Sequence, residues 1–288
     1  MIRINRLMFG YDRQTCFKEI NLDFEPGRIY GFLGKNGAGK TTLFKLMSGL
    51  LIPKSGECSV IGYASADKKP GMLQDMFFVP ESFYLPKVTL KKYVILHAPF
   101  YPKFDYPMFN SLLDQFELEK GRHLHSLSYG LKKRFLLAFA LASNCNVLLL
   151  DEPTNGLDIP AKRIFRKMLI SALNEKRTIV IATHQIKEIE NAFDSLVIID
   201  QGRILLNSSI EKISRTLQCE TVSSLQDIQS CLFKEKVAGG YSIITENFNE
   251  IESSMDIEFL FNAVTNQPPE LMEVLHKIQE KGADNGIY

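Results

Sequence analysis

Cysteine is sparse in this 288-residue sequence, and its distribution excludes two common kinds of site. The five cysteines are odd in number, widely separated and form no Cys-x-x-Cys pair. Disulfide frameworks and structural zinc sites need paired or closely spaced cysteines, so neither is expected. Free cysteines of this kind are typical of proteins in the reducing cytosol.

Long hydrophobic runs and a strong net charge are also absent. No uninterrupted apolar stretch approaches the roughly 18 residues of a membrane-spanning helix. Residues 1–7 lack the apolar core of a signal peptide and alternate like an edge strand. The net charge is +1, and no basic run is interleaved with aromatics, so no nucleic-acid partner is expected. We expect a chain that does not itself cross a membrane.

The hydrophobic pattern indicates an α/β fold. The composition is that of an ordinary globular protein, with 45% hydrophobic and 23% charged residues. Short runs that are apolar on both faces recur between segments of helical periodicity, which fits a parallel sheet covered by helices. The expected strands are 29–33, 76–79, 147–150, 178–182 and 196–199. Between the third and fourth, an apolar stripe over residues 164–172 predicts an amphipathic helix on the sheet.

Two segments depart from this alternation. Residues 88–127 are rich in aromatics and prolines and contain a helical run at 108–116, so an inserted helical subdomain is expected at about 88–142. After residue 205 the pattern weakens. The predictions there are a hairpin around Gly239-Gly240, a strand at 257–261 and a helix opened by Pro268-Pro269. We therefore expect a main domain over residues 1–205 and a small α/β accessory domain over 206–288.

A phosphate-binding loop follows the first apolar strand. Residues 34–41 read Gly-Lys-Asn-Gly-Ala-Gly-Lys-Thr and match G-x-x-x-x-G-K-[ST] between a strand and a helical run, the context that the motif requires. Glycines let backbone N–H groups surround phosphates, the lysine adds positive charge, and the hydroxyl is a ligand for Mg²⁺. A chance match is the alternative, and the flanking strand and helix argue against it. The expected nucleotide contacts are Gly34, Asn36, Gly37, Ala38, Gly39, Lys40, Thr41 and Thr42.

Two adjacent carboxylates end the strand at 147–150. Asp151 and Glu152 stand where α/β sheets place their ligands, so Asp151 is expected to support Mg²⁺ and Glu152 to orient and deprotonate an attacking water. A solvated Asp-Glu turn after a core strand is the alternative interpretation of these two residues alone.

Together these motifs resemble the ATP-binding cassette (ABC) ATPases, and the resemblance spans residues 1 to about 205. Residues 127–134, Leu-Ser-Tyr-Gly-Leu-Lys-Lys-Arg, are similar to the signature segment of that family, and residues 156–158 are similar to its dimer-contact loop. His184 resembles the switch histidine, in the same order and spacing. The resemblance implies a P-loop NTPase cassette with a mixed central sheet.

Two further positions complete the resemblance. Tyr11 matches the aromatic that stacks on adenine, and Glu81 occupies the place of the glutamine loop. Taken singly, Tyr11 is also an ordinary strand-end aromatic, His184 a hydrogen-bonded polar residue and Asp158 the N-cap of a helix. Because all three stand in the same order along the chain as the motifs of the family, the functional interpretation is favoured. Asp158 can serve both as a helix N-cap and in the dimer-contact loop.

The signature and the glutamine loop also depart from the usual pattern. Tyr129 and Leu131 replace a glycine and the glutamine of Leu-Ser-Gly-Gly-Gln, while Ser128 and Gly130 are retained, a form familiar among bacterial exporter ATPases. Glu81 replaces glutamine, and its carboxylate is a hard ligand suited to Mg²⁺.

By this resemblance the residues take defined roles around ATP and Mg²⁺. Lys40 binds the phosphates, Glu152 and His184 act on the attacking water and the γ-phosphate, and Thr41, Glu81 and Asp151 hold the metal. Ser128 and Gly130 serve the nucleotide of the opposite monomer, and Asp158, in the dimer-contact loop, is also expected among the nucleotide-binding residues. ATP binding then joins two subunits, either as a homodimer or with a second ABC ATPase, and hydrolysis releases them.

Two classes of function are compatible with such an ATPase. The first is export through a separate transmembrane permease, with the chain peripheral on the inner face of the cell membrane and docked between the Glu81 loop and residues 93–101. The accessory domain, Glu81 and Leu131 favour this exporter hypothesis by analogy. The alternative is a soluble ABC ATPase for assembly, repair or translation. A P-loop kinase is disfavoured by the signature segment and His184.

Overall fold

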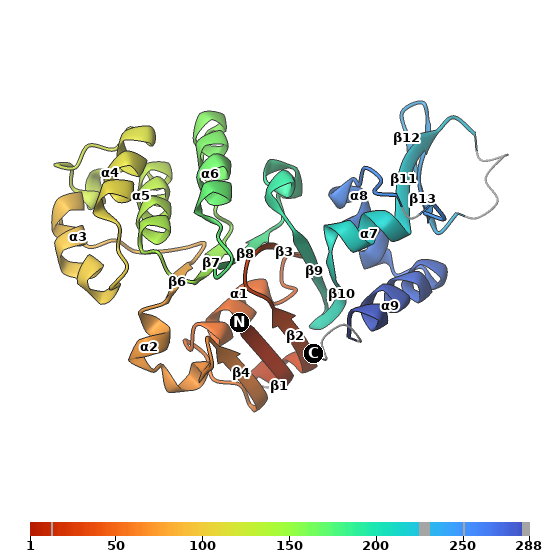
Figure 1. The fold of residues 1–288 in the computed structure, drawn as a ribbon, viewed down its shortest axis with the longest axis horizontal. Coiled ribbons are helices and arrows are strands. Elements are labelled where there is room, and N and C mark those ends of the chain that lie inside the picture. Colours follow the sequence, from red (N-terminus) through yellow and green to blue (C-terminus); the bar gives the residue numbers. More distant parts are fainter. Residues whose placement is uncertain (13, 225–230, 250, 284–288) are drawn as a thin grey trace.

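A six-stranded mixed sheet forms the centre of the molecule (Figure 1). The computed structural model describes residues 1–12, 14–224, 231–249 and 251–283. Only the strand at one edge of the sheet is antiparallel to its neighbour. The strands in order across the sheet are β10 (Arg203–Ser209), β9 (Ser195–Asp200), β3 (Arg28–Gly34), β8 (Thr178–Thr183), β7 (Val147–Asp151) and β6 (Met76–Val79). The five predicted apolar runs are the five parallel strands, and the α/β fold class is confirmed.

A second, antiparallel sheet covers one side of this centre. Its order is β2 (Gln14–Phe24), β1 (Ile2–Tyr11), β4 (Ser55–Val60) and β5 (Tyr63–Ala64). The prediction of an edge strand at the N-terminus is wrong, because β1 pairs with both β2 and β4. Its alternation arises from one buried face, which an interior strand of a half-covered antiparallel sheet shows as well as an edge strand.

Helices fill both sides of the central sheet. Helix α1 (Lys40–Met47) lies in the core between the two sheets, where Phe44 stacks against Phe32. Helix α5 (Tyr129–Ala142) and helix α6 (Ile159–Ala172) share the core on the opposite face. Helix α6 contains the predicted apolar stripe, of which Phe165, Met168, Leu169 and Ala172 are buried and Ile164 is partly buried. Short helix α2 (Pro70–Leu73) precedes β6.

The predicted helical insertion lies at one end of the sheet (Figure 1). It comprises α3 (Leu90–His97), α4 (Tyr106–Gln115) and α5, and the predicted helical run at 108–116 corresponds to α4. The aromatic residues of this segment form a cluster around Phe139, whose ring contacts those of Tyr93, Tyr101 and Phe104. The aromatic content therefore supplies the core of the subdomain.

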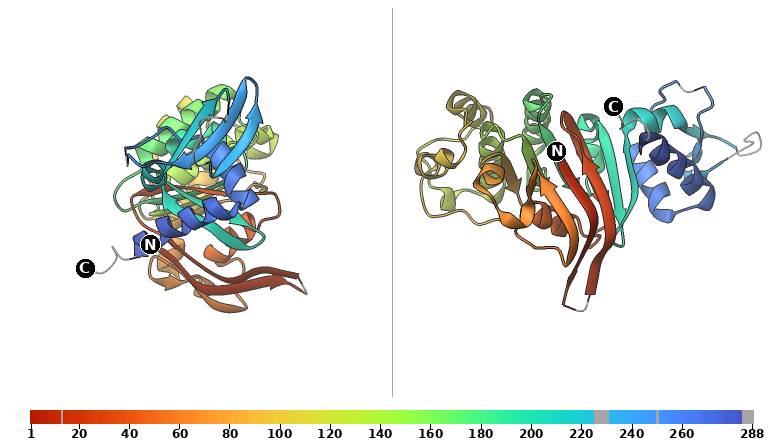
Figure 2. Two further views of the ribbon diagram at one scale, coloured as in Figure 1. Left: turned by 90° about the vertical axis from the view of Figure 1, so that its right-hand side faces the viewer. Right: turned by 60° about the horizontal axis from the view of Figure 1, so that its bottom comes forward.

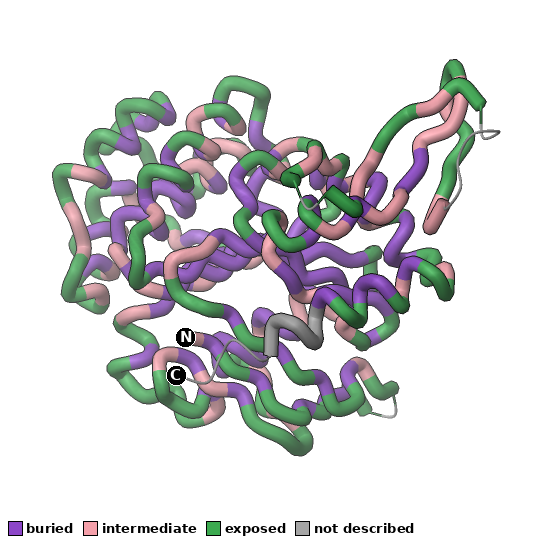
Figure 3. The backbone as a smooth tube through the Cα atoms, turned by 45° about the vertical axis from the view of Figure 1, so that its right-hand side comes forward, coloured by how far each residue is buried: buried purple, intermediate pink, exposed green. Residues whose placement is uncertain are grey.

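The C-terminal elements lie at the opposite end (Figures 1 and 2). Helix α7 (Ile210–Thr216) leads to a three-stranded antiparallel sheet that extends from the body in Figure 3, and two helices follow. These remaining elements are β11 (Leu217–Val222), β12 (Phe233–Val237), β13 (Gly240–Glu246), α8 (Ile257–Asn266) and α9 (Pro269–Ala283). The predicted hairpin at Gly239-Gly240 joins β12 to β13, and the predicted helix after Pro268 is α9.

The prediction of a strand at 257–261 is wrong. This segment begins α8, because the Asp256 carboxylate accepts a hydrogen bond from the Phe259 N–H and caps the helix. Ile257, Leu260 and Val264 are buried at helical spacing. A five-residue apolar run does not distinguish a strand from a buried helix.

The main sheet and the C-terminal elements are joined closely. The expected boundary between residues 205 and 206 falls inside β10, and one hydrophobic cluster continues from the main sheet to Ile244, Leu260 and Leu271. Within 206–288, residues 225–230, 250 and 284–288 lie outside the described residues. Of the helices that the structure describes, none is both long and apolar enough to cross a membrane.

Candidate nucleotide-binding site

The phosphate loop is shaped by glycines that either the backbone conformation or close packing favours. Gly39 precedes α1 with a φ of +105°, and a Cβ there would lie 2.7 Å from the Phe17 ring. Gly37 has a φ of +81° and open space around it. A Cβ on Gly34 would lie 2.7 Å from the carbonyl oxygen of Ile199 on β9. The loop therefore packs directly on the sheet and leaves its N–H groups and the start of α1 at the pocket.

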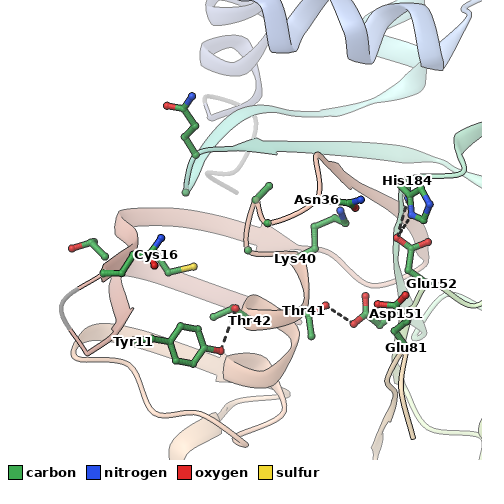
Figure 4. A pocket seen from close by; sticks show the side chains of 17 residues that line it. Tyr11, Cys16, Asn36, Lys40, Thr41, Thr42, Glu81, Asp151, Glu152 and His184 are labelled. Atoms are coloured by element: carbon green, nitrogen blue, oxygen red, sulfur yellow. Dashed lines mark hydrogen bonds and ion pairs between the residues drawn. The ribbon is translucent and has the colours of Figure 1, made fainter.

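This loop borders a cavity of about 700 Å³ at the carboxyl ends of the parallel strands (Figure 4). The predicted residues Asn36, Gly37, Ala38, Gly39, Lys40, Thr41 and Thr42 line it, together with Tyr11, Glu81, Asp151, Glu152 and His184. The tertiary structure thus brings twelve of the predicted site residues into one pocket. Gly34 does not line the cavity, but its carbonyl oxygen accepts a hydrogen bond from Nζ of Lys40.

Lys40 is folded back on its own loop. Its Nζ donates to the Gly34 carbonyl oxygen at 2.6 Å and to that of Lys35 at 3.3 Å. Burial lowers the pKa of Lys40, and the carboxylates of Glu152, Asp151 and Glu81 oppose that shift. Lys40 is therefore a buried cation near three acidic side chains, and a divalent metal ion bound here would offset their excess of negative charge.

Thr41 and Asp151 are joined directly. The Thr41 hydroxyl donates to Oδ2 of Asp151 at 2.7 Å, which brings the start of α1 to the end of β7. Burial raises the pKa of Asp151, and the neighbouring carboxylates of Glu152 and Glu81 add to the shift. A hydroxyl and a carboxylate in contact, with a second carboxylate on the same pocket, form a set of hard oxygen donors that fits Mg²⁺.

Glu152 is held by hydrogen bonds from the end of β8. Its Oε2 accepts from the Thr183 hydroxyl at 3.0 Å, and its Oε1 lies 2.7 Å from Nδ1 of His184. Glu152 is 4% exposed and has a φ of +45°, a left-handed conformation that is uncommon outside glycine. The carboxylate is thereby fixed at the pocket wall in an orientation suited to accept a proton.

Tyr11 and Glu81 lie at opposite sides of the cavity. Tyr11 is 48% exposed, and its hydroxyl is 3.4 Å from Oγ1 of Thr42, so its ring borders the open part of the pocket. Glu81 follows β6, and its Oε1 accepts a 3.4 Å hydrogen bond from Nδ2 of Asn155. Asn155 therefore holds the carboxylate that the sequence predicts as a metal ligand.

Besides Gly34, three of the predicted residues lie outside this cavity. Ser128 is the N-cap of α5 and accepts from the Leu131 N–H, while Asp158 caps α6 and forms an ion pair with Arg134 at 2.6 Å. A Cβ on Gly130 would lie 2.5 Å from the carbonyl oxygen of Gly156. The glycine is thus required by close packing within this chain, in addition to the expected approach to a phosphate.

Sequence reasoning missed several residues around the site. Thr183 holds Glu152, and its place at the end of β8, directly before His184, is a signal that could have found it. Lys133 is fully buried and donates to the carbonyl oxygens of Pro80 and Asp151, each at 3.2 Å. Nothing in the basic run 132–134 distinguishes this lysine from its neighbours. Cys16 and Gln201 also line the cavity.

Comparison with known proteins identifies the family. The sequence profile described as ABC transporter matches residues 17–155. The bacitracin transport ATP-binding protein BcrA of Bacillus licheniformis is 32% identical over 210 residues, which are 71% of this chain and 68% of that protein. This chain belongs to the ABC transporter family.

Other proteins similar to this ABC transporter protein are also ATP-binding subunits of ABC transporters. The ABC transporter ATP-binding protein YtrB of Bacillus subtilis is 32% identical over 192 residues, which are 66% of this chain and 65% of YtrB, just under two thirds of its length. A solved ATP-binding subunit of an ABC transporter is 26% identical, with a TM-score of 0.69 over 75% of this chain and 92% of that one. Membership of this family supports the predicted ABC transporter ATP-binding subunit over a soluble assembly, repair or translation factor.

Proposed function

We propose that this ABC subunit hydrolyses ATP with Mg²⁺ and thereby drives export through a separate transmembrane permease. The observation that carries the proposal is the convergence of Lys40, Thr41, Asp151, Glu152 and His184 on one cavity at the carboxyl ends of the strands. Phosphoryl transfer to water needs positioning and charge stabilisation rather than covalent chemistry, and these side chains supply both.

The residues of the cavity divide this work. Lys40 and the N–H groups of the phosphate loop hold the β- and γ-phosphates. Thr41, Asp151 and Glu81 hold Mg²⁺, which when bound neutralises charge on the phosphates. Glu152 accepts a proton from the attacking water as the bond between the γ-phosphorus and the bridging oxygen breaks. Tyr11 stacks on the adenine.

His184 links the general base to the phosphate. With Glu152 ionised, Nδ1 of His184 donates to the carboxylate at 2.7 Å, which fixes the tautomer and leaves Nε2 free to face the γ-phosphate. The contact orients both groups at once. Loss of either side chain is therefore expected to disturb the other.

Dimerisation completes each site. Ser128 and Gly130 lie outside the cavity of their own chain, on the helical subdomain, and we assign them to the nucleotide of a second ATPase subunit. Asp158 stands in the loop beside them, and its side chain is 59% exposed and accessible to a partner. A second copy of this chain and a different ABC ATPase both supply the required signature segment.

The membrane partner is assigned to the surface beside the Glu81 loop. Residues 93–101 expose Ile95, Leu96 and Phe100, and Tyr84 next to the loop is 81% exposed. Exposed apolar side chains close together are typical of docking surfaces. This surface would hold the chain as a peripheral protein on the inner face of the cell membrane.

Affinity purification from native membranes tests the proposed function. The Glu152→Gln variant with ATP is used to hold the closed dimer, and copurifying proteins are identified by mass spectrometry. A stoichiometric multi-span protein that is lost when Ile95, Leu96 and Phe100 are changed to serine supports the proposal. A soluble partner in its place, or no multi-span protein in repeated preparations, contradicts it.

A further inference from the structure

Tyr129 joins the signature segment to the Glu81 loop. It occupies a signature position where glycine is usual, at the first residue of α5. Its hydroxyl donates to the backbone carbonyl oxygen of Glu81 at 2.7 Å. Its ring stacks on Phe83 with centroids 5.4 Å apart and an angle of 22° between the planes. One side chain therefore contacts the loop at two points.

The same ring also packs on the loop that follows Glu152. Gly156 has a φ of +79°, and a Cβ there would lie 2.6 Å from Cδ1 of Tyr129. Gly156 is in turn so close to Gly130 that no side chain fits between them. Tyr129 thus lies between two loops that both follow strands of the nucleotide site, namely β6 and β7.

Hydrogen bonds connect the first turn of α5, which begins with Tyr129, to the residues that follow β6. Ser128 caps the helix through the Leu131 N–H, and one turn later Lys133 donates to the Pro80 carbonyl oxygen at 3.2 Å. The start of the helix is therefore bonded to the loop through Glu81 and through Pro80. A displacement of the loop changes these bonds unless the turn that carries Ser128 moves with it.

We propose that Tyr129 is a positioning residue that sets the orientation of Ser128 and Gly130 from the position of the Glu81 loop. The inference rests on the proposed function, in which these two residues bind the nucleotide of the other subunit and the Glu81 loop borders both the metal site and the permease surface. Tyr129 itself is not among the residues that line the nucleotide cavity of its own chain. Through Tyr129, the position of the Glu81 loop beside one nucleotide site affects the signature residues that complete the site of the other subunit.

The test separates nucleotide binding from dimer formation. Tyr129→Phe removes the hydroxyl and keeps the ring contacts, and Tyr129→Leu removes both. The control is Tyr63→Phe, a half-exposed tyrosine on β5 in the other sheet. In the Glu152→Gln background, the ATP concentration at half-maximal dimerisation is measured by light scattering. Binding of a fluorescent ATP analogue is measured at protein concentrations too low for dimers.

The expected result is a selective effect on dimerisation. Loss of one hydrogen bond raises the ATP midpoint about fivefold for Tyr129→Phe, and Tyr129→Leu raises it further. Binding of the analogue by Tyr129→Phe stays at the parent value, as it does for Tyr63→Phe, while the thermal midpoint falls only by the loss of that one hydrogen bond. Amide hydrogen exchange over residues 80–85 becomes faster in both Tyr129 variants and is unchanged in the control.

Two outcomes overturn different parts of the argument. A parent Glu152→Gln protein that does not dimerise with ATP overturns the proposed dimer and, with it, the role of Tyr129 toward a second subunit. A parent that dimerises normally, with an unchanged midpoint and unchanged exchange in Tyr129→Phe, overturns the positioning role alone. A parallel loss of analogue binding and thermal stability in Tyr129→Phe also overturns it, because a purely structural role would produce that result.

Discussion

Glu152 and His184 are hydrogen bonded through two atoms of the histidine. Oε1 of Glu152 lies 2.7 Å from Nδ1 of the ring and accepts a 3.1 Å hydrogen bond from the His184 backbone N–H. The two residues come from the ends of neighbouring parallel strands, β7 and β8, so the sheet itself sets their separation. The carboxylate is thus oriented before any substrate binds.

This contact makes Glu152→Gln the sharpest test of catalysis. Glutamine keeps the shape of the side chain but cannot accept the proton of the attacking water. Turnover is expected to fall by about 10²- to 10⁴-fold, the usual contribution of a general base, while nucleotide affinity is retained. Phosphate release and fluorescent-nucleotide binding measure the two quantities. Retention of normal turnover would refute the assignment of the base.

Tyr11 provides a test of adenine stacking. Base stacking on an aromatic side chain contributes about 1–3 kcal/mol, so Tyr11→Ala should weaken ATP binding at least about fivefold. Tyr11→Phe should bind nearly as the parent does, because the lost contact with Thr42 is long, at 3.4 Å, and exposed. Titration with a fluorescent ATP analogue measures both. Equal affinities for the parent and Tyr11→Ala would place the adenine elsewhere.

Asp158 has two structural roles that different substitutions separate. Its Oδ1 accepts from the Ala161 N–H and caps α6, and its Oδ2 pairs with Arg134. Asp158→Ala removes both and should lower the free energy of unfolding by about 1 kcal/mol, whereas Asp158→Asn keeps a cap and should lose less than half of that. Urea denaturation measures the difference. An equal loss in the two variants would assign the effect to the ion pair.

The burial of Lys133 should make the free energy of unfolding depend on pH in the alkaline range. Burial lowers its pKa to about 8, from 10.5 for a free lysine. Between these values the unfolded chain binds more protons at this residue than the folded chain does, so the free energy of unfolding rises with pH. Relative to Lys133→Met, the gain of the parent between pH 8 and 10.5 is at most about 3 kcal/mol.

Chemical denaturation of the parent and Lys133→Met across this pH range measures the effect. Cysteines and tyrosines that titrate in the same range are present in both proteins and cancel in the difference. The difference should be constant below about pH 7, where the lysine is charged in both states. A flat difference up to pH 10.5 would show that Lys133 titrates normally despite its burial.

Local features of the sequence predict most of the residues that the fold brings to the cavity. A glycine pattern between a strand and a helix predicts a phosphate loop wherever it occurs, because its geometry is set by neighbouring residues. Continuous apolar runs predict the five parallel strands, because a strand that is buried on both faces has no polar positions. Asp151 and Glu152 follow such a run directly, so their place at the end of the sheet was implied.

The tertiary structure decided what depends on neighbours distant in the sequence. The alternation of residues 1–7 predicts one buried face but not the number of pairing strands, and the apolar run at 257–261 suits a helix as well as a strand until Asp256 is seen to cap it. The burial of Lys133 beneath Asp151 could not be predicted from a basic run.

The contacts of Tyr129 are decided in the same way. Glu81 and Tyr129 are 48 residues apart, and only the packing of α5 against the end of β6 brings them within hydrogen-bonding distance. The sequence by itself predicts the chemistry of the candidate site, because each of its motifs is formed by residues next to one another in the chain. The connections between its parts were decided by the fold, because they depend on how separate helices and strands pack.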